Sequence, residues 1–372
     1  MKILFISLLV LHGLIHLMGF TKAFDFAPMS ALSGDTLFPM TKSSKPIFGS
    51  LWLIACLLFL WTVVAYFLGK SGWWMTAAAA ILLSQFLIVV YWQDAKAGTI
   101  ANFLILLVAL VGFGNWKNEG MIRTEISAIF SKNPPAAATI VNEEMLVPLP
   151  LVVQNWLRQS GVLGKPLMQT VQLHQKGLMR TKPAGNWLKT AAVQYFRTDA
   201  PAFIWDAEVK MMPGIYFSGR DKLQDGKGNM LIKLLSLYPI VDGRGDKIDQ
   251  GTLLRFLGEM VWFPSAALSQ YISWEAAGDN AAKATLRHAG LEVSGIFTFD
   301  ELGRPIEFSA ERYFGSGEEA KLQKWYVPMR AWKTFDGITI PSAGDVVWRL
   351  PEGDYNYFQW EITDIEYDRP LP

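Results

Sequence analysis

The chain has little of several residue types on which common enzymes and secreted domains depend. Its 372 residues include one cysteine, Cys56, so no internal disulfide can form. This argues against a disulfide-stapled ectodomain and fits a bacterial protein. The formal net charge is only +1, and basic residues form no stripe interleaved with aromatics. Without that electrostatic footprint, nucleic acid is excluded as a partner.

Motifs typical of nucleotide-binding proteins and hydrolases are missing as well. The sequence contains no P-loop, dinucleotide fingerprint, G-x-S-x-G elbow or Cys/His zinc spacing. Beyond residue 120 there are only two histidines, His174 and His288, and no cysteine, which removes the commonest nucleophile–base pairs. Carboxylates are plentiful there, but acidic residues on strands usually form the solvated face. The sequence therefore points away from an enzyme and identifies neither a catalytic residue nor a cofactor.

Charged residues are sparse up to Asn115 and recur every few residues from Trp116 onward. Four apolar stretches in the first part approach the roughly 20 residues needed to cross a bilayer core. Tryptophans gather mostly near their ends, as an aromatic belt requires. We therefore expect a four-helix transmembrane domain over residues 1–116 and a multi-pass protein of the cell membrane. The expected spans are residues 3–20, 47–68, 73–92 and 100–113.

The first stretch has a second interpretation, a cleaved signal peptide. Its long apolar run, its two histidines and the lack of a small-x-small site after it favour a retained helix. Four crossings place both chain ends on one side of the membrane. The basic residues of the two sets of loops nearly balance, so charge does not indicate which side that is.

Two histidines within the first span are the polar residues of most interest there. His12 and His16 are four positions apart and project from one helix face. Such a pair could hold a metal or haem, or relay protons, as in a membrane enzyme or redox protein. Alternatively, the imidazoles hydrogen-bond across the bundle to Ser84, Gln85 or Asn102 and fix helix packing. The spacing allows both hypotheses.

Between the two parts, residues 117–144 are assigned to a linker. The Pro-Pro pair within residues 131–138 cannot continue a helix and indicates a flexible tether. A short amphipathic helix is expected over residues 151–160, ended by Gly161.

Beyond Lys165 the hydrophobic period changes from helical to twofold, which is typical of half-buried strands. About a dozen such runs follow, joined by turns such as Asp336-Gly337 that favour hairpins. This order predicts an antiparallel β domain over residues 145–372, folded as a large curved sheet or half-barrel.

One stretch interrupts the strands. Residues 249–263 are predicted to form a helix that is apolar on most sides, and such a helix must be buried, here on the concave face of the sheet. Within it, Arg255 and Glu259 are four positions apart and can pair. They form either a solvated surface pair or a buried pair beside a cavity, where they would orient a polar head group.

Several motifs resemble an uncharacterised family of bacterial membrane proteins that contain a domain of unknown function. The similarity is carried by L-H-G-L-I-H at residues 11–16, L-R-F-L-G-E-M-V-W-F-P at 254–264, F-T-F-D-E-L-G-R at 297–304 and E-R-Y at 311–313. The resemblance covers most of the chain and implies no established activity. By architecture alone, the layout is also similar to lipoprotein carriers of the LolA/LolB kind, half-barrels that hold acyl chains. That likeness would place the β domain outside the cytoplasm.

These observations favour a membrane-anchored binding protein whose curved sheet holds a lipid or another hydrophobic small molecule. The membrane helices would keep it beside its lipid source. A membrane enzyme or a metal or haem protein using His12 and His16, and a protein-binding scaffold or sensor, are the alternatives. The sequence does not indicate the oligomeric state. The residues expected to contact the ligand are Arg255, Glu259, Trp262, Trp205, Phe217 and Trp274.

Overall fold

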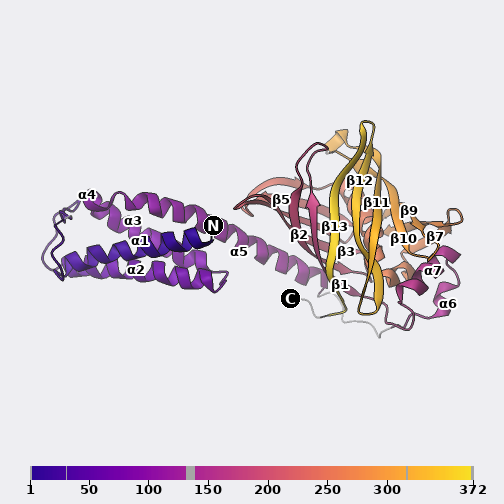
Figure 1. Cartoon of the computed structure of the whole chain (residues 1–372), viewed down its shortest axis with the longest axis horizontal. Coiled ribbons are helices and arrows are strands. Elements are labelled where there is room, and N and C mark those ends of the chain that lie inside the picture. The colour runs from indigo at the N-terminus through magenta and orange to yellow at the C-terminus, as the bar shows by residue number, and fades with distance from the viewer. Residues whose placement is uncertain (1, 31, 131–138, 316, 370–372) are drawn as a thin grey trace. The chain divides into compact units, whose positions relative to one another are not determined.

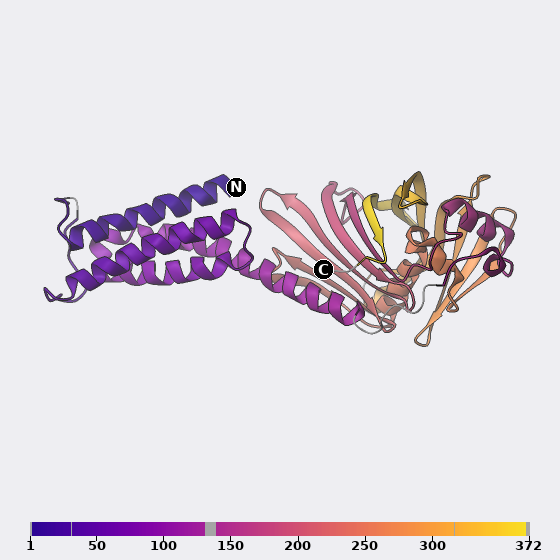
Figure 2. The ribbon, with the colours of Figure 1, turned by 90° about the horizontal axis from the view of Figure 1, so that it is seen from below.

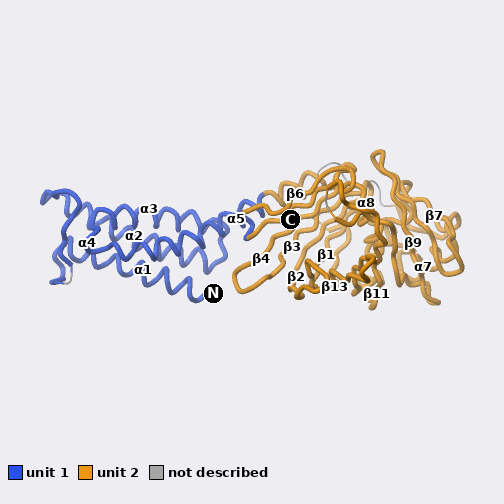
Figure 3. The backbone as a smooth tube through the Cα atoms, turned by 90° about the horizontal axis from the view of Figure 1, so that it is seen from above, with its two compact units in different colours: residues 1–120, 235–237 blue, residues 121–234, 238–372 orange. Residues whose placement is uncertain are grey.

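The computed structural model describes residues 2–30, 32–130, 139–315 and 317–369. The chain divides into two compact units, coloured separately in Figure 3. The first, called here the helical unit, comprises residues 1–120 and the short segment Leu235–Leu237. The second, called here the β unit, comprises residues 121–234 and 238–372. The predicted tether at residues 131–138 lies outside the described residues.

Four helices of the helical unit are long and apolar enough to cross a membrane. They occur where the sequence predicts four spans. The last differs in length: it continues to Phe130, through the first half of the segment assigned to the linker. The helices are α1 (Lys2–Ala23), α2 (Lys45–Phe67), α3 (Trp73–Val90) and α5 (Gly98–Phe130), with the single turn α4 (Trp92–Ala95) between the last two.

Glycines on α1 allow it to approach α2 closely. A Cβ atom at Gly19 would lie 2.5 Å from the Trp52 ring, and one at Gly13 would lie 3.0 Å from Cβ of Phe59. Small residues at such positions are the usual means by which membrane helices pack, because lipid offers no hydrophobic driving force between them. Phe59 is fully buried as a result.

The β unit contains one antiparallel sheet, with thirteen strands in its described part, which curves as a half-barrel (Figures 1 and 2). The predicted fold class is confirmed. The strand order is β6-β5-β4-β3-β2-β1-β13-β12-β11-β10-β9-β8-β7, so nearly every neighbour in space is a neighbour in sequence. The strands are β1 (Thr170–Met179), β2 (Leu188–Arg197), β3 (Ala202–Met212), β4 (Ile215–Gln224), β5 (Lys227–Leu234), β6 (Tyr238–Gly243), β7 (Ile272–Ala276), β8 (Ala281–His288), β9 (Leu291–Phe299), β10 (Pro305–Phe314), β11 (Lys321–Phe335), β12 (Ile338–Leu350) and β13 (Gly353–Tyr367).

Short helices fill much of the curve, and the predicted buried helix is among them. It begins at Asp246 and ends at Glu259, where a 3₁₀ turn replaces the predicted continuation to residue 263. Its apolar residues join the strands in one hydrophobic core. The segments involved are α6 (Glu143–Leu146), α7 (Leu151–Ser160), α8 (Asp246–Glu259), η1 (Met260–Trp262) and η2 (Pro264–Leu268); η3 (Gly317–Glu319) is a further short turn.

The last part of α5, residues 121–130, packs on the other, convex face of the sheet. Ile122, Ile126 and Ile129 form a small core with Tyr195 and Ile204. Glu125 adds ion pairs to Arg220 at 3.1 Å and to Lys222 at 2.9 Å. The concave face is therefore left to the helices of the β unit itself.

Candidate functional site

Strand register arranges the concave face of β1–β5 into rows that cross the strands. Because side chains alternate between faces, directly opposite residues share a face. Three neighbouring rows matter here. The outer row is Leu234, Phe217, Val209, Thr190 and Gly177; the middle row is Ile232, Gly219, Ala207, Ala192 and Gln175; the inner row is Met230, Asp221, Trp205, Gln194 and Leu173.

Helix α8 lies over the inner row. The Arg255 guanidinium donates hydrogen bonds of 2.7 Å to Asp221 and of 2.7 Å to Glu259. Gln194 donates to the other carboxylate oxygen of Glu259 at 2.8 Å. The guanidinium carbon also lies 5.0 Å from the ring centroid of Trp205. These contacts form a polar cluster within an otherwise apolar interior.

The Arg255–Glu259 pair is mostly withdrawn from solvent, unlike a solvated surface pair. Their side chains are 15% and 12% exposed. Burial raises the pKa of Glu259 above its usual value, although Arg255 and Gln194 favour its charged form. Burial would lower the pKa of Arg255, but Glu259 and Asp221 keep it above its usual value. One guanidinium thus pairs with two carboxylates.

The other expected ligand-contacting residues are placed unequally. The Trp205 indole donates to Gln175 at 2.9 Å and belongs to the polar cluster. Trp262 packs edge-on against Trp360, at 5.2 Å between ring centroids. Phe217 lies in the outer row, half-buried. Trp274 lies in the other half of the sheet, on β7, so the structure does not bring it together with the rest.

The indole N–H of Trp262 is buried and has no hydrogen-bond acceptor among the described residues. Trp360, against which it packs, continues the outer row, since it pairs with Gly177. A buried donor without a partner is uncommon in native proteins and is explained by a water or a ligand atom. This donor therefore indicates a polar atom near the outer row.

Asp221 and Gln194 belong to the cluster but were not among the expected site residues. A signal for Asp221 was present, because it lies between Gly219 and Leu223 on the inward face of an alternating strand. A charge on that face is unusual and needs a partner. Gln194 gives no such signal, because the sequence does not show which strands lie beneath the helix.

Beyond α8, the middle and outer rows are mostly apolar, and they are partly open at their β4–β5 end. Phe217, Ile232 and Leu234 are half-buried rather than buried, whereas Leu223, which lies nearer α8, is fully buried. Gly219, Ala207 and Ala192 occupy the centre of the middle row, where larger side chains would fill the curve. We call the middle and outer rows together the uncovered strip.

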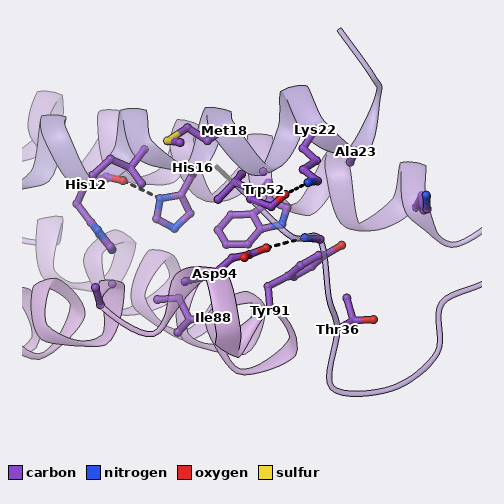
Figure 4. A pocket seen from close by; sticks show the side chains of 18 of the residues that line it. His12, His16, Met18, Lys22, Ala23, Thr36, Trp52, Ile88, Tyr91 and Asp94 are labelled. Atoms are coloured by element: carbon purple, nitrogen blue, oxygen red, sulfur yellow. Dashed lines mark hydrogen bonds between the residues drawn. The ribbon is translucent and has the colours of Figure 1, made fainter. Parts of the chain in front are cut away.

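The helical unit contains a cavity of about 400 Å³ at the end of the bundle where α1 ends and α5 begins. Figure 4 shows the rings of His16, Trp52 and Tyr91 around it. The loop after α1 crosses this end of the bundle. Lys22 donates to the carbonyl oxygens of Met29 and Leu32 in this loop.

The loop is fastened at a second point by Asp94. Its carboxylate accepts hydrogen bonds from the backbone amides of Ser33 at 3.0 Å and Gly34 at 2.8 Å. Burial would raise the pKa of Asp94, but these amides and the nearby Lys22 lower it below its usual value. The charged groups at this end of the bundle therefore hold the loop over the cavity.

His12 and His16 lie at the inner end of this cavity and are hydrogen-bonded across the bundle. His16 Nδ1 donates to the carbonyl oxygen of His12 at 2.7 Å, and its Nε2 is hydrogen-bonded to the Ser84 hydroxyl at 2.8 Å. His12 Nε2 donates to Asn102 Oδ1 at 2.9 Å. The Asn102 amide in turn donates to Ser84 and Gln85. Both histidines are thus members of one hydrogen-bond network.

These hydrogen bonds across the bundle are the ones expected if the histidine pair fixes helix packing. Both ring nitrogens of His16 are engaged in hydrogen bonds within the bundle. Within the described residues, no group of three or more His, Cys, Asp and Glu side chains could hold a metal ion.

Replacing Asn102 with leucine tests the network. The change removes the acceptor of His12 and one of the donors to Ser84 in a medium that cannot replace them, and we expect a loss of about 1 kcal/mol in stability. Thermal unfolding in detergent measures it. Phe103→Leu is the control, because Phe103 is the next residue on α5 and is largely exposed. Equal effects of the two changes would show that the network contributes nothing.

Residues 139–360 match the model of a Family of unknown function (DUF6544). The chain belongs to this family. The match confirms the expected resemblance to an uncharacterised family. None of the curated proteins matches the chain.

Two solved structures are similar to part of the chain. One is a LolA superfamily protein from Nitrosomonas europaea, 10% identical, covering 60% of this chain and 96% of that protein, with a TM-score of 0.35. The other is a DUF1329 family protein from Desulfovibrio piger, 11% identical, covering 60% of this chain and 95% of that protein, with a TM-score of 0.32.

Proposed function

We propose that this protein is a membrane-anchored binding protein that holds a lipid acyl chain or a similar apolar ligand on the uncovered strip. The observation that carries the proposal is the half-exposure of Phe217, Ile232 and Leu234 on the concave face, beyond the end of α8. Burial of each methylene contributes about 0.8 kcal/mol, so ten methylenes contribute about 8 kcal/mol before the entropy of ordering the chain is subtracted.

The packing of the rest of the interior limits where the ligand lies. The half of the sheet around Trp274 is filled by α7 and neighbouring rings, and the inner row is covered by α8. The middle and outer rows are not covered in this way at their β4–β5 end. A polar head group would meet the cluster of Arg255 and Asp221 on one side, or the unpartnered N–H of Trp262 on the other.

The helices supply the anchor in this proposal. Four of them are apolar and long enough to cross a membrane, and α5 continues directly into residues that pack on the convex face of the sheet. Attachment through the convex face leaves the concave face accessible. A ligand taken from the bilayer would then remain close to its source.

Ligand binding is tested with the full chain in detergent, by native mass spectrometry and by uptake of a fluorescent fatty acid. We expect Ile232→Glu to weaken uptake more than about tenfold, because the new carboxylate must be desolvated against the acyl chain. Ile296→Glu is the matched control, since Ile296 is an exposed isoleucine on the other face of β9. A chain that takes up no fatty acid, or two variants that lose equal affinity, would refute the proposal.

A further inference from the structure

One arginine of the sheet has no acidic partner. Every other arginine on the described strands pairs with a carboxylate at 3.2 Å or less; these are Arg197, Arg220, Arg287, Arg330 and Arg349. The guanidinium of Arg312, on β10, has neither an ion pair nor a hydrogen bond within the described residues. A guanidinium carries five N–H donors and no acceptor, so these donors are left for water or for a ligand.

Arg312 lies on the side of β10 that faces the core, and it is half-buried. Its guanidinium carbon is 4.8 Å from the ring centroid of Trp325 and 5.7 Å from that of Trp348, and both indoles belong to the hydrophobic core. A Cβ atom at Gly251 of α8 would lie 3.3 Å from its Nε, so the absence of a side chain there leaves room for the guanidinium beside the helix. The group is therefore held between α8 and the concave face of the sheet.

The surroundings of Arg312 stabilise a cation but leave its donors unused. The faces of the two indoles attract the positive charge, yet an indole supplies no hydrogen-bond acceptor. A charge that is partly withdrawn from water gains from an anionic partner. Carboxylate and phosphate groups match the planar fork of a guanidinium and bind it through two parallel hydrogen bonds. The position thus favours a ligand atom group of that kind.

The guanidinium of Arg255 does not offer the same site. It already pairs with Asp221 and Glu259, at 2.7 Å each. An anionic group brought to it would also meet these two carboxylates, and like charges at such distances repel. Gly251, beside Arg312, precedes Arg255 by one helical turn on α8, which is about 6 Å along the helix axis. Of these two guanidinium groups beside α8, only that of Arg312 is available to an anion.

Aromatic rings connect Arg312 with the part of the concave face next to the uncovered strip. Trp348 stacks on Tyr357 at 6.4 Å between ring centroids. Tyr357 and Phe358 are consecutive on β13 and both pack in the hydrophobic core. Phe358 in turn contacts Trp205 of the inner row edge-on, at 6.4 Å. These rings form a continuous apolar surface between the guanidinium and the inner row.

From this placement we propose that the ligand of the β unit has an anionic head group, a carboxylate or a phosphate monoester, and that Arg312 binds it. The inference rests on the proposed function and deepens it by naming the ligand class, an acyl or alkyl chain that ends in an anion. The chain would lie on the apolar surface, and the head group would accept hydrogen bonds from the guanidinium.

Ligands that differ only in the head group test the inference with the full chain in detergent. Hexadecanoate, hexadecyl phosphate and hexadecanol carry the same chain, and each is used to displace a fluorescent fatty alcohol from the protein. We expect the two anions to act at about tenfold lower free concentration than hexadecanol, because hydrogen bonds between charged groups contribute that much to affinity. Arg312→Gln should abolish this preference and leave the affinity for hexadecanol unchanged.

Arg304→Gln is the matched control. Arg304 also lies over an indole, 4.4 Å from the ring centroid of Trp332, but it pairs with Asp300 at 2.7 Å. This variant should keep the full preference for the anions. Where Arg312→Gln does not fold, Arg312→Lys decides, because lysine keeps the charge but lacks the planar fork, and the preference should fall severalfold.

Equal displacement by the anions and by hexadecanol in the intact protein would overturn the head-group inference and leave the proposed function standing. An undiminished preference in Arg312→Gln or Arg312→Lys would also overturn it, since the anion would then be bound elsewhere. A protein that binds neither the anions nor hexadecanol would refute the proposed function and this inference together. A preference for one anion over the other, lost in Arg312→Gln, supports the inference and identifies the head group.

Discussion

Replacing Arg255 with leucine is expected to lower the free energy of unfolding of the β unit by about 3–5 kcal/mol. The guanidinium is the shared partner of Asp221 and Glu259, and its removal leaves two carboxylates in a mostly buried site. The penalty comes from those uncompensated charges rather than from the lost attraction, since a buried ion pair gains little over an apolar pair. Hydrogen exchange of the strand amides, measured on the full chain, reports this free energy.

Arg287→Leu is the matched control for that experiment. Arg287 also bonds a carboxylate at 2.7 Å, that of Glu292, but the two side chains are 59% and 58% exposed. Water screens such a pair, and its loss should cost less than about 1 kcal/mol. Equal costs at the two positions would mean that the cluster around Arg255 is effectively solvated.

The effect of Arg255→Leu should shrink as the pH is lowered. Without the guanidinium, Glu259 loses a partner that favours its charged form, so its pKa rises further in the folded state and the cost of keeping it charged is greatest near neutral pH. Protonation of Glu259 at lower pH removes that cost. A pH-independent loss would instead indicate a purely steric effect.

Local signals explain the elements that the sequence predicts most closely. Helix α7 spans residues 151–160 as expected, because Pro150 precedes its first turn and Gly161 ends it in the left-handed region, at φ 79°. The alternation along residues 203–211 likewise predicts β3 and its two faces. Both features depend only on neighbouring residues, so sequence alone is sufficient for them.

Elements whose local sequence patterns are short or change along their length are harder to predict from the sequence. The twofold pattern does not predict strand β6, since this strand has six residues and contains Pro239, which removes a backbone donor. The extension of α5 to Phe130 follows a change from apolar to charged residues after Asn115, which marks the end of a span but not the end of a helix. The apolar stripe of this extension, Ile122, Ile126 and Ile129, is buried by its contact with the sheet.

The site depends on pairings between distant parts of the chain. Spacing shows that Arg255 and Glu259 share a helix face, but not that Asp221 and Gln194 lie beneath them, 34 and 61 residues from Arg255 in sequence. The same holds for His12, whose partner Asn102 is 90 residues away. Periodicity predicts which face a residue occupies, whereas its neighbours follow from strand order and helix packing.

Replacing Trp156 with alanine is expected to cost about 3–5 kcal/mol, because the cavity left by a large ring collapses only partly. Trp156 is 2% exposed and contacts the rings of Trp274, Phe297 and Phe299 in the half of the sheet away from the uncovered strip. Thermal unfolding of the full chain measures the loss. Leu151→Ala is the control, since Leu151 lies on the same helix and is 67% exposed, and it should change stability by less than about 0.5 kcal/mol.

Fatty-acid uptake by the Trp156 variant distinguishes the two halves of the sheet. If the ligand lies on the uncovered strip, the folded variant retains its affinity, because α7 and its rings only support the distant half of the sheet. A folded variant that loses affinity would place the ligand beside Trp274 instead, in a space that α7 fills when no ligand is bound. Stability and binding must therefore be measured on the same sample, below the unfolding temperature of the variant.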